Sequence, residues 1–302
     1  VERALNDDFA LSVTYQYVKG SDLPRTTDIN VSNPTTVTVP VVSALTGASL
    51  GTSTFTRYTG RPFTNFARVL EFQSSANSRY HGITFDLQKR FSDNWQMRIA
   101  YTYSKVKDDK PDATAVVPGT DDPKYAQDPL NLHGDWAPGD NDVPSRIVLS
   151  GVWSLDSYSS KMGGMSRAIL GGWTISGIVS WQTGQPYSAV TSADLNGDGN
   201  ARNDRAPGFA RNSFRLPSQY SVDPRLTKDI GLYAGARLQL IAEAFNLLNR
   251  SNVNGVRNNL YAVTSTAGVP TKFTLQDNVN PFGQPTSSFG PRILQFAAKV
   301  TF

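Results

Sequence analysis

Apolar and polar residues alternate along this chain in eight separate segments. In the last segment, residues 290–302, one face is entirely apolar and consists of Leu294, Phe296, Ala298, Val300 and Phe302. A period of two places alternate side chains on opposite faces of a β-strand, so each segment predicts a strand with one apolar and one polar face. The other seven segments are 9–17, 82–91, 95–104, 146–155, 172–182, 222–232 and 236–246.

The lengths of these strands and of their connections favour a membrane-spanning barrel. Strands of about 9–11 residues match a tilted crossing of a bilayer, whereas strands of soluble proteins average about 5–6 residues. Tight turns at 92–94 and 233–235 and a moderate connection at 156–171 alternate with long loops at about 19–78, 105–144, 184–222 and 247–288. Long loops on one side and short turns on the other are typical of outer-membrane barrels. The pattern therefore predicts an all-β fold, an antiparallel transmembrane β-barrel with extracellular loops and periplasmic turns.

Aromatic residues fall at both ends of the predicted strands, on the apolar face. With the long loops outside, Trp95, Trp153 and Trp173 lie near the periplasmic end, and Tyr103 and Trp181 lie near the extracellular end. Trp173 and Trp181 share a face and would be about 20 Å apart in height, which is close to the height of the apolar band of such barrels. These five residues are the predicted aromatic girdles.

Composition excludes several other classes of protein. The 302 residues carry a net charge of +4 and no cysteine, and the mean hydropathy is -0.35. No dense basic run suggests nucleic-acid binding, and no apolar stretch approaches the roughly 18–20 residues of a membrane helix. No arrangement of nucleophile, base or zinc ligands stands out, so we predict that the chain is not an enzyme. A secreted β-sandwich that binds carbohydrate remains an alternative to the barrel.

Five stretches resemble sequences of one family, the TonB-dependent outer-membrane transporters. "EAFNLLNRSN" (243–252) resembles the penultimate strand, "GPRILQFAAKVTF" (290–302) the last strand, and "YHGITFDLQKRFSDNWQMRIAYTYSKVKDD" (80–109) a repeated hairpin of that family. "LPRTTDIN" (23–30) and "GDGNARNDRAPG" (197–208) resemble its Oar-like branch. The resemblance implies a receptor in the bacterial outer membrane that takes up a bulky solute with energy supplied through TonB.

The resemblance also implies partners for the chain. It implies contact with outer-membrane lipid and a plug domain through which TonB acts. A surface lipoprotein above the loops is a further candidate partner, which the sequence alone does not reveal. Phe296, Val300 and Phe302 resemble the C-terminal signal read by the barrel-assembly machinery.

Members of the family have a signal peptide, a plug and a barrel of 22 strands, whereas residues 1–302 show eight strands and neither of the other parts. Two interpretations stay open. Residues 1–302 are the C-terminal segment of a larger barrel and pair with the rest of it, or they form a small passive, structural or adhesive barrel.

One loop carries part of a calcium-binding pattern. Asp194, Asn196 and Asp198 occupy positions 1, 3 and 5 of a calcium loop, with glycine at position 6. An arginine stands at position 12, where a bidentate glutamate belongs, so Asp204 or Asn203 would have to replace that ligand. The alternative is a plain turn rich in Asx and Gly residues. Ca²⁺ is the one cofactor that the sequence suggests.

Two further features concern charge. The acidic segment 121–142 predicts a solvated loop, with a cationic or carbohydrate ligand as the alternative. Lys228 interrupts the apolar face of its strand, and it should therefore lie near the periplasmic interface, where a lysine costs about 0–1 kcal/mol and not the 2–4 kcal/mol of the midplane.

Overall fold

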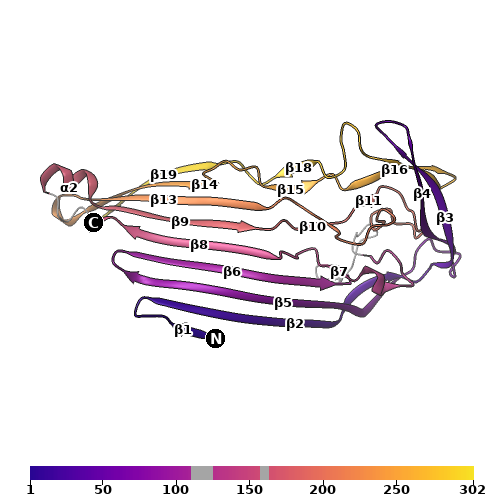
Figure 1. Ribbon diagram of the computed structural model, residues 1–302, viewed down its shortest axis with the longest axis horizontal. Coiled ribbons are helices and arrows are strands. Elements are labelled where there is room, and N and C mark those ends of the chain that lie inside the picture. Colours follow the sequence, from indigo (N-terminus) through magenta and orange to yellow (C-terminus); the bar gives the residue numbers. More distant parts are fainter. Residues whose placement is uncertain (110–124, 157–162) are drawn as a thin grey trace.

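A computed structural model describes residues 1–109, 125–156 and 163–302, and the regular secondary structure of these residues is almost entirely β (Figure 1). The main sheet has the order β1-β2-β5-β6-β8-β9-β13-β14-β19, and each neighbouring pair is antiparallel. Its strands are β1 (Glu2–Ala4), β2 (Phe9–Asp28), β5 (Leu70–Ser92), β6 (Trp95–Asp108), β8 (Ser145–Ser154), β9 (Trp173–Gln182), β13 (Gln219–Gly231), β14 (Arg237–Phe245) and β19 (Ile293–Thr301), with β7 (Ala137–Pro138) paired to β6.

All eight predicted strands are present, in the predicted antiparallel arrangement. Both ends of β8 and β9 lie within one residue of the predicted ends. β6 begins at the predicted residue and ends four residues later than predicted. β2 and β5 are much longer than predicted, at 20 and 23 residues, because both continue past the wall into the region expected to be loop. The short β1 and β7 were not predicted.

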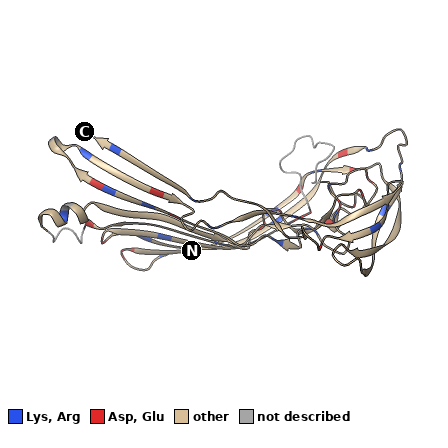
Figure 2. Cartoon of the chain, turned by 90° about the horizontal axis from the view of Figure 1, so that it is seen from above, with Lys and Arg blue, Asp and Glu red and all other residues tan. Residues whose placement is uncertain are grey.

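Within the described residues, no second layer covers the apolar face of the main sheet. On this face Phe85, Trp153 and Phe296 have exposed fractions of 41%, 43% and 76%. A soluble sandwich would bury such a face, whereas a barrel wall turns it towards lipid. Seen from above, the sheet is strongly curved, and the strand at the C-terminal edge lies well apart from the N-terminal strands (Figure 2).

Connections at one end of the sheet are short, as predicted. Asp93 and Asn94 join β5 to β6, and their positive φ angles of 48° and 68° suit a tight hairpin turn. The 3₁₀ turn η2 (Tyr233–Gly235) joins β13 to β14, and helix α2 (Gly164–Leu170) precedes β9 at the same end (Figure 1). Within the described residues, no helix combines the length and the apolar character that crossing a membrane requires.

The long loops are present as predicted, and they form sheets of their own that the sequence did not predict. A five-stranded sheet has the order β11-β16-β17-β3-β4, and β10 pairs with β12 and β15 with β18. The strands are β3 (Ser32–Ser43), β4 (Ser49–Gly60), β10 (Pro186–Tyr187), β11 (Val190–Thr191), β12 (Phe214–Arg215), β15 (Val253–Val256), β16 (Asn259–Thr266), β17 (Val269–Leu275) and β18 (Pro285–Ser288). Two contacts in the five-stranded sheet, β11–β16 and β17–β3, are parallel.

The predicted girdle residues lie near the two ends of the wall strands. Trp95 lies directly opposite Trp153 near the turn end, and Trp173 lies opposite Lys228. At the loop end, Tyr103 stands opposite Ser145 of β8, and Trp181 lies one row lower on the same apolar face. Their function as membrane girdles stays a prediction.

Lys228 lies at the turn end, beside helix α2, as its charge requires. Its Nζ donates a hydrogen bond to the carbonyl of Ile169 (3.1 Å) and another to the carbonyl of Gly171, and it lies 5.2 Å from the ring centroid of Trp173. Carbonyls at the C-terminal end of a helix carry partial negative charge and therefore stabilise the ammonium.

The orientation of the wall can be tested with a matched pair of substitutions. Leu149→Arg should destabilise the protein by about 2–4 kcal/mol, because Leu149 lies mid-strand on the outer face, between Ile99 and Val179. Val148→Arg should change stability by about 1 kcal/mol or less, because that side chain faces the lumen. Equilibrium unfolding from lipid vesicles measures both, and equal losses would contradict the assigned faces.

Candidate functional site

The loops at the end opposite the tight turns fold together into one assembly, which we call the loop cap (residues 29–69, 125–144, 183–218 and 246–292). Its five-stranded sheet combines segments that are more than 200 residues apart, since Val41 of β3 pairs with Phe273 of β17. Val39, Val41 and Phe273 of this sheet form a small apolar cluster with Leu195 of a neighbouring loop. The cap is therefore a folded surface and not a set of independent loops.

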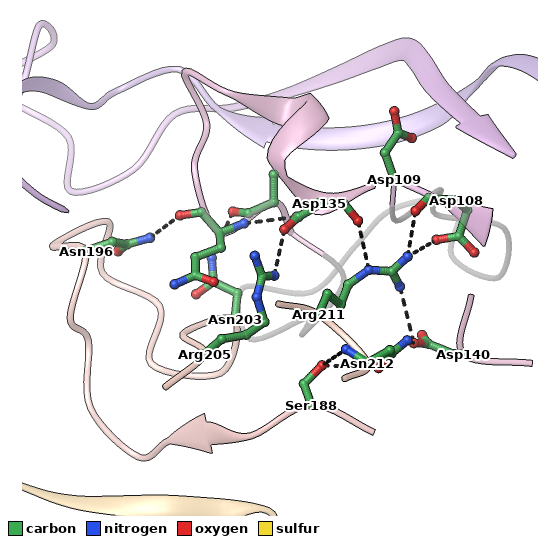
Figure 3. A network of polar contacts seen from close by, with 12 residues as sticks. Asp108, Asp109, Asp135, Asp140, Ser188, Asn196, Asn203, Arg205, Arg211 and Asn212 are labelled. Carbon is green, nitrogen blue, oxygen red and sulfur yellow. Dashed lines mark hydrogen bonds and ion pairs between the residues drawn. The ribbon is translucent and has the colours of Figure 1, made fainter. Parts of the chain in front are cut away.

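Arg211 is the centre of a buried polar network in the cap (Figure 3). The residue is 3% exposed. Its Nε donates to the backbone carbonyl of Asp135 (3.1 Å), its Nη2 to the carbonyl of Asp108 (2.7 Å) and to the Asp108 carboxylate, and its Nη1 to Asp140 (3.3 Å). One guanidinium thus connects the end of β6 to two positions of the next loop.

Two further arginine–aspartate pairs join residues 183–218 to residues 125–144, and a third joins β2 to the residue that follows β6. A buried pair is strongly destabilising to break, because one charge is left without its partner in a poorly solvated site. These pairs explain why the acidic segment 121–142 does not behave as predicted: Asp135 and Asp142 are 2% and 1% exposed, so the expectation of a solvated loop is wrong for them. Residues 121–124 lie outside the described residues. The pairs are Arg25–Asp109 (2.5 Å), Arg205–Asp135 (2.6 Å) and Arg215–Asp142.

The predicted calcium loop brings three of its carboxylates together. One oxygen from each of Asp194, Asp198 and Asp204 lies within 4.8 Å of the other two. Asp198 is 1% exposed and Asp204 is fully buried. Asp204, and not the position-12 residue Arg205, lies beside the other two carboxylates, while Arg205 pairs with Asp135.

Backbone amides hold this acidic cluster in place. The carboxylate of Asp194 accepts hydrogen bonds from the amides of Gly197 (2.6 Å) and Gly199 (3.0 Å). Both glycines have φ in the left-handed region, at +76° and +87°, which other residues rarely adopt. The carboxylate of Asp204 accepts hydrogen bonds from the amides of Leu195 (3.1 Å) and Asn196 (3.3 Å). The loop thus wraps around the carboxylates.

The two amides of the motif have different surroundings. Asn196 accepts a hydrogen bond from the Asp198 amide (2.8 Å) and donates to the carbonyl of Gln127 (2.7 Å), so it braces the loop. Asn203 is 2% exposed and donates to Asp198 (2.9 Å) and to the carbonyl of Ala126 (3.1 Å). The Oδ1 atom of Asn203 has no hydrogen-bond partner among the described residues.

Burial disfavours the charged form of the carboxylates in the acidic cluster. Desolvation raises the pKa of Asp204 well above its ordinary value, and the nearby carboxylates of Asp198 and Asp194 raise it further. Desolvation also raises the pKa of Asp198. Like charges this close cannot all ionise unless a proton or a cation compensates them.

The family can be assigned from the sequence as a whole. A family model described as an outer membrane beta barrel domain matches residues 1–210 and 208–295. The chain belongs to this outer membrane beta barrel family. The uncovered apolar face is consequently the lipid-facing wall of a barrel in the bacterial outer membrane. The alternative of a secreted β-sandwich is wrong.

Two solved structures are similar to this member of the barrel family. One is the outer membrane transporter YddB from Escherichia coli, with 12% identity and a TM-score of 0.45, over 98% of this chain and 31% of that one. The other is FpvA from P. aeruginosa bound to a heterologous pyoverdine and iron, with 10% identity and a TM-score of 0.39, over 99% and 32%. The chain thus spans about a third of each structure. No curated protein matches the chain.

The arginine network was not predicted from the sequence. The signal was present, because Arg202, Arg205, Arg211 and Arg215 follow one another closely and an acidic segment lies elsewhere in the loops. Their pairing could not be read from the sequence, since the partners are about 70–100 residues apart along the chain.

The role of Phe296, Val300 and Phe302 as an insertion signal stays a prediction. The structure places Phe296 and Val300 on the outer face of β19.

The network predicts that the cap depends on Arg211. Arg211→Ala should destabilise the cap by about 3–5 kcal/mol, because it removes a buried cation shared by separate segments. Limited proteolysis in the native membrane should then cleave residues 125–144 and 197–218 faster. Arg202→Ala, at an exposed site in the same loop, serves as the control, and equal cleavage of the two variants would contradict the assignment.

Proposed function

We propose that this chain forms part of the barrel of a TonB-dependent receptor of the Oar-like branch, which takes up a bulky solute. The observation that carries the proposal is the curved antiparallel wall whose two edges do not pair with each other in the described residues. Unpaired strand edges are unfavourable in lipid, so further strands would close the barrel. Residues 1–302 would then be its C-terminal segment.

The parts of the chain take separate roles in this proposal. The wall strands enclose the lumen, and the loop cap provides part of the extracellular surface that binds the solute. A plug in the lumen would contact TonB, and the barrel-assembly machinery would read the C-terminal strand. A surface lipoprotein above the cap would be a further partner. No residue of this chain is assigned a catalytic role.

A small passive barrel is the competing proposal, and it needs a wall that closes on itself. In the described residues β19 pairs with β14 alone, and every residue of β19 is exposed. The opposite edge carries the three-residue β1 on the much longer β2. A closed ring of this chain would have to pair β19 with that edge, and this arrangement is not observed.

The intact mass of the protein distinguishes the two proposals. After extraction from its native membrane, denaturing mass spectrometry should give a mass far above 32.9 kDa, because plug and further strands belong to the same polypeptide. A mass near 32.9 kDa would overturn the receptor proposal and favour the small barrel.

We further propose that the acidic cluster binds Ca²⁺ and stabilises the loop cap. Carboxylate oxygens are the ligands that this hard cation prefers. Three of them converge here, two belong to buried residues, and the buried Oδ1 of the adjacent Asn203 has no hydrogen-bond partner among the described residues. A cation would compensate the charges that burial otherwise disfavours. Asp194, Asp198 and Asp204 would hold it.

Calcium removal tests this second proposal. At a Ca²⁺ concentration of about 100 times Kd, binding should stabilise the cap by about 2.7 kcal/mol, and chelation should remove that gain. Asp204→Asn should abolish the response, whereas Asp22→Asn, at an exposed site outside the cluster, should preserve it. Thermal unfolding with and without chelator measures the effect. An unchanged midpoint in the unsubstituted protein would refute the calcium site and leave the receptor proposal intact.

A further inference from the structure

Basic side chains gather on the outer face of the barrel near the loop end of β2, β5 and β6, three strands that lie side by side (Figure 1). In one row Tyr17, His81 and Lys105 stand opposite one another, and in the next row Lys19, Arg79 and Lys107 do so. We call the five basic residues the basic patch: Lys19, Arg79, His81, Lys105 and Lys107.

The basic patch continues the lipid-facing surface upwards. Directly opposed strand partners share a face, and the row below the patch contains Tyr15, Ile83 and Tyr103. Tyr15 also donates to or accepts from His81 through a 2.8 Å contact between its hydroxyl and Nδ1. Tyrosines of this kind lie at the level of lipid headgroups, so the cations just above them face the charged part of the outer leaflet.

No carboxylate of the described residues neutralises the charges of the patch. In that part of the chain, no ion pair with a carboxylate is made by any of the four lysine and arginine residues of the patch, which are Lys19, Arg79, Lys105 and Lys107. The acidic residues that follow Lys107 in the sequence, at positions 108 and 109, face Arg211 and Arg25 instead. Four cations therefore remain available to an anion from outside.

The spacing of the patch suits phosphate groups. Neighbouring strands lie about 4.8 Å apart and successive rows of one face about 7 Å apart, so the cations occupy an area of roughly 10 by 7 Å. Arginine binds phosphate with two parallel hydrogen bonds, and lysine adds point charges. One phosphate, or two on the same headgroup, can contact several of these side chains at once.

A pocket of about 410 Å³ adjoins the patch on its loop side. Its lining includes Lys19, Arg79, His133 and Trp136, and also Asp109, whose carboxylate is held by Arg25. The rings of His133 and Trp136 are stacked, with centroids 6.1 Å apart, and the Arg79 guanidinium lies 5.9 Å from the Trp136 centroid. A flat aromatic surface beside cations suits a phosphorylated sugar better than a bare phosphate ion.

We propose that the basic patch binds the phosphate groups of a phosphorylated glycolipid of the outer leaflet, and that the pocket receives part of its sugar. The continuity of the patch with the apolar wall favours a lipid over a protein partner, because the acyl chains would lie on the residues below. Bound lipid would fix the height of the barrel in the membrane. This inference depends on the outer-membrane location and not on the receptor proposal.

Lipid retention by the protein, extracted from its native membrane, tests the proposal. The triple variant Lys19→Gln, Arg79→Gln, Lys105→Gln should lower the affinity for added lipopolysaccharide by at least about tenfold, since each cation near an anionic surface contributes to binding. Native mass spectrometry counts the bound lipid. The matched control removes three exposed cations elsewhere, with Arg3→Gln, Arg167→Gln and Arg202→Gln, and should bind normally.

Two further measurements keep the result decisive. A charge-retaining variant, Lys19→Arg, Arg79→Lys and Lys105→Arg, should bind lipid within a fewfold of the original protein, which separates lost charge from misfolding. Dephosphorylated lipopolysaccharide should bind as weakly as the triple Gln variant binds the intact lipid. Three results would overturn the proposal. The intact and dephosphorylated lipids could bind equally, inorganic phosphate could displace the lipid completely, or the triple Gln variant could lose a bound acidic protein and not a bound lipid.

Discussion

Backbone hydrogen bonding in lipid is the constraint on which the rest of this structure depends. Inside a bilayer no water can pair with exposed amides and carbonyls, so every wall strand has to be bonded to a neighbour. The ladder runs without a break from β2 to β19, and its pairs between β14 and β19 extend from Arg237–Thr301 to Phe245–Ile293. With the backbone satisfied in this way, alternate side chains can face lipid and lumen.

The loop cap is built on a different balance of forces. Most of the large apolar side chains of the wall point outwards. Among the described residues, the apolar clusters of the cap itself are small, and one of them consists of Ala189, Ala206 and Leu260. Its segments are held instead by desolvated arginine–aspartate pairs and by carboxylates that accept backbone amides. Directional contacts of this kind give loops from different hairpins one fixed arrangement. The loop cap is therefore a surface of defined shape, and the position of the wall in the membrane would set the height of that surface.

Local periodicity was sufficient to predict the strands of the wall from the sequence, but not those of the cap. The segment Trp173–Gln182 alternates so regularly that its strand was placed to within one residue. The cap strands had the same kind of signal, since Val37, Val39 and Val41 alternate with threonine and proline. Their surroundings are rich in Pro, Ser, Thr and Gly, and their pairing partners are distant, so the pattern was interpreted as loop. The calcium motif was visible because its three acidic residues lie within eleven positions of one another.

The sequence by itself determined the eight long strands of the wall: their order, their two faces, their tight turns and the rows in which aromatic residues lie. It could do so because each wall strand pairs mainly with its neighbour in the chain, and the lipid acts on every strand in the same way. Only the tertiary structure decided which arginine meets which aspartate, how Asp204 joins Asp194 and Asp198, and where Lys19, Arg79 and Lys107 come together. These contacts depend on register between strands and on closure of loops that are many residues apart, and no local pattern of residues encodes either.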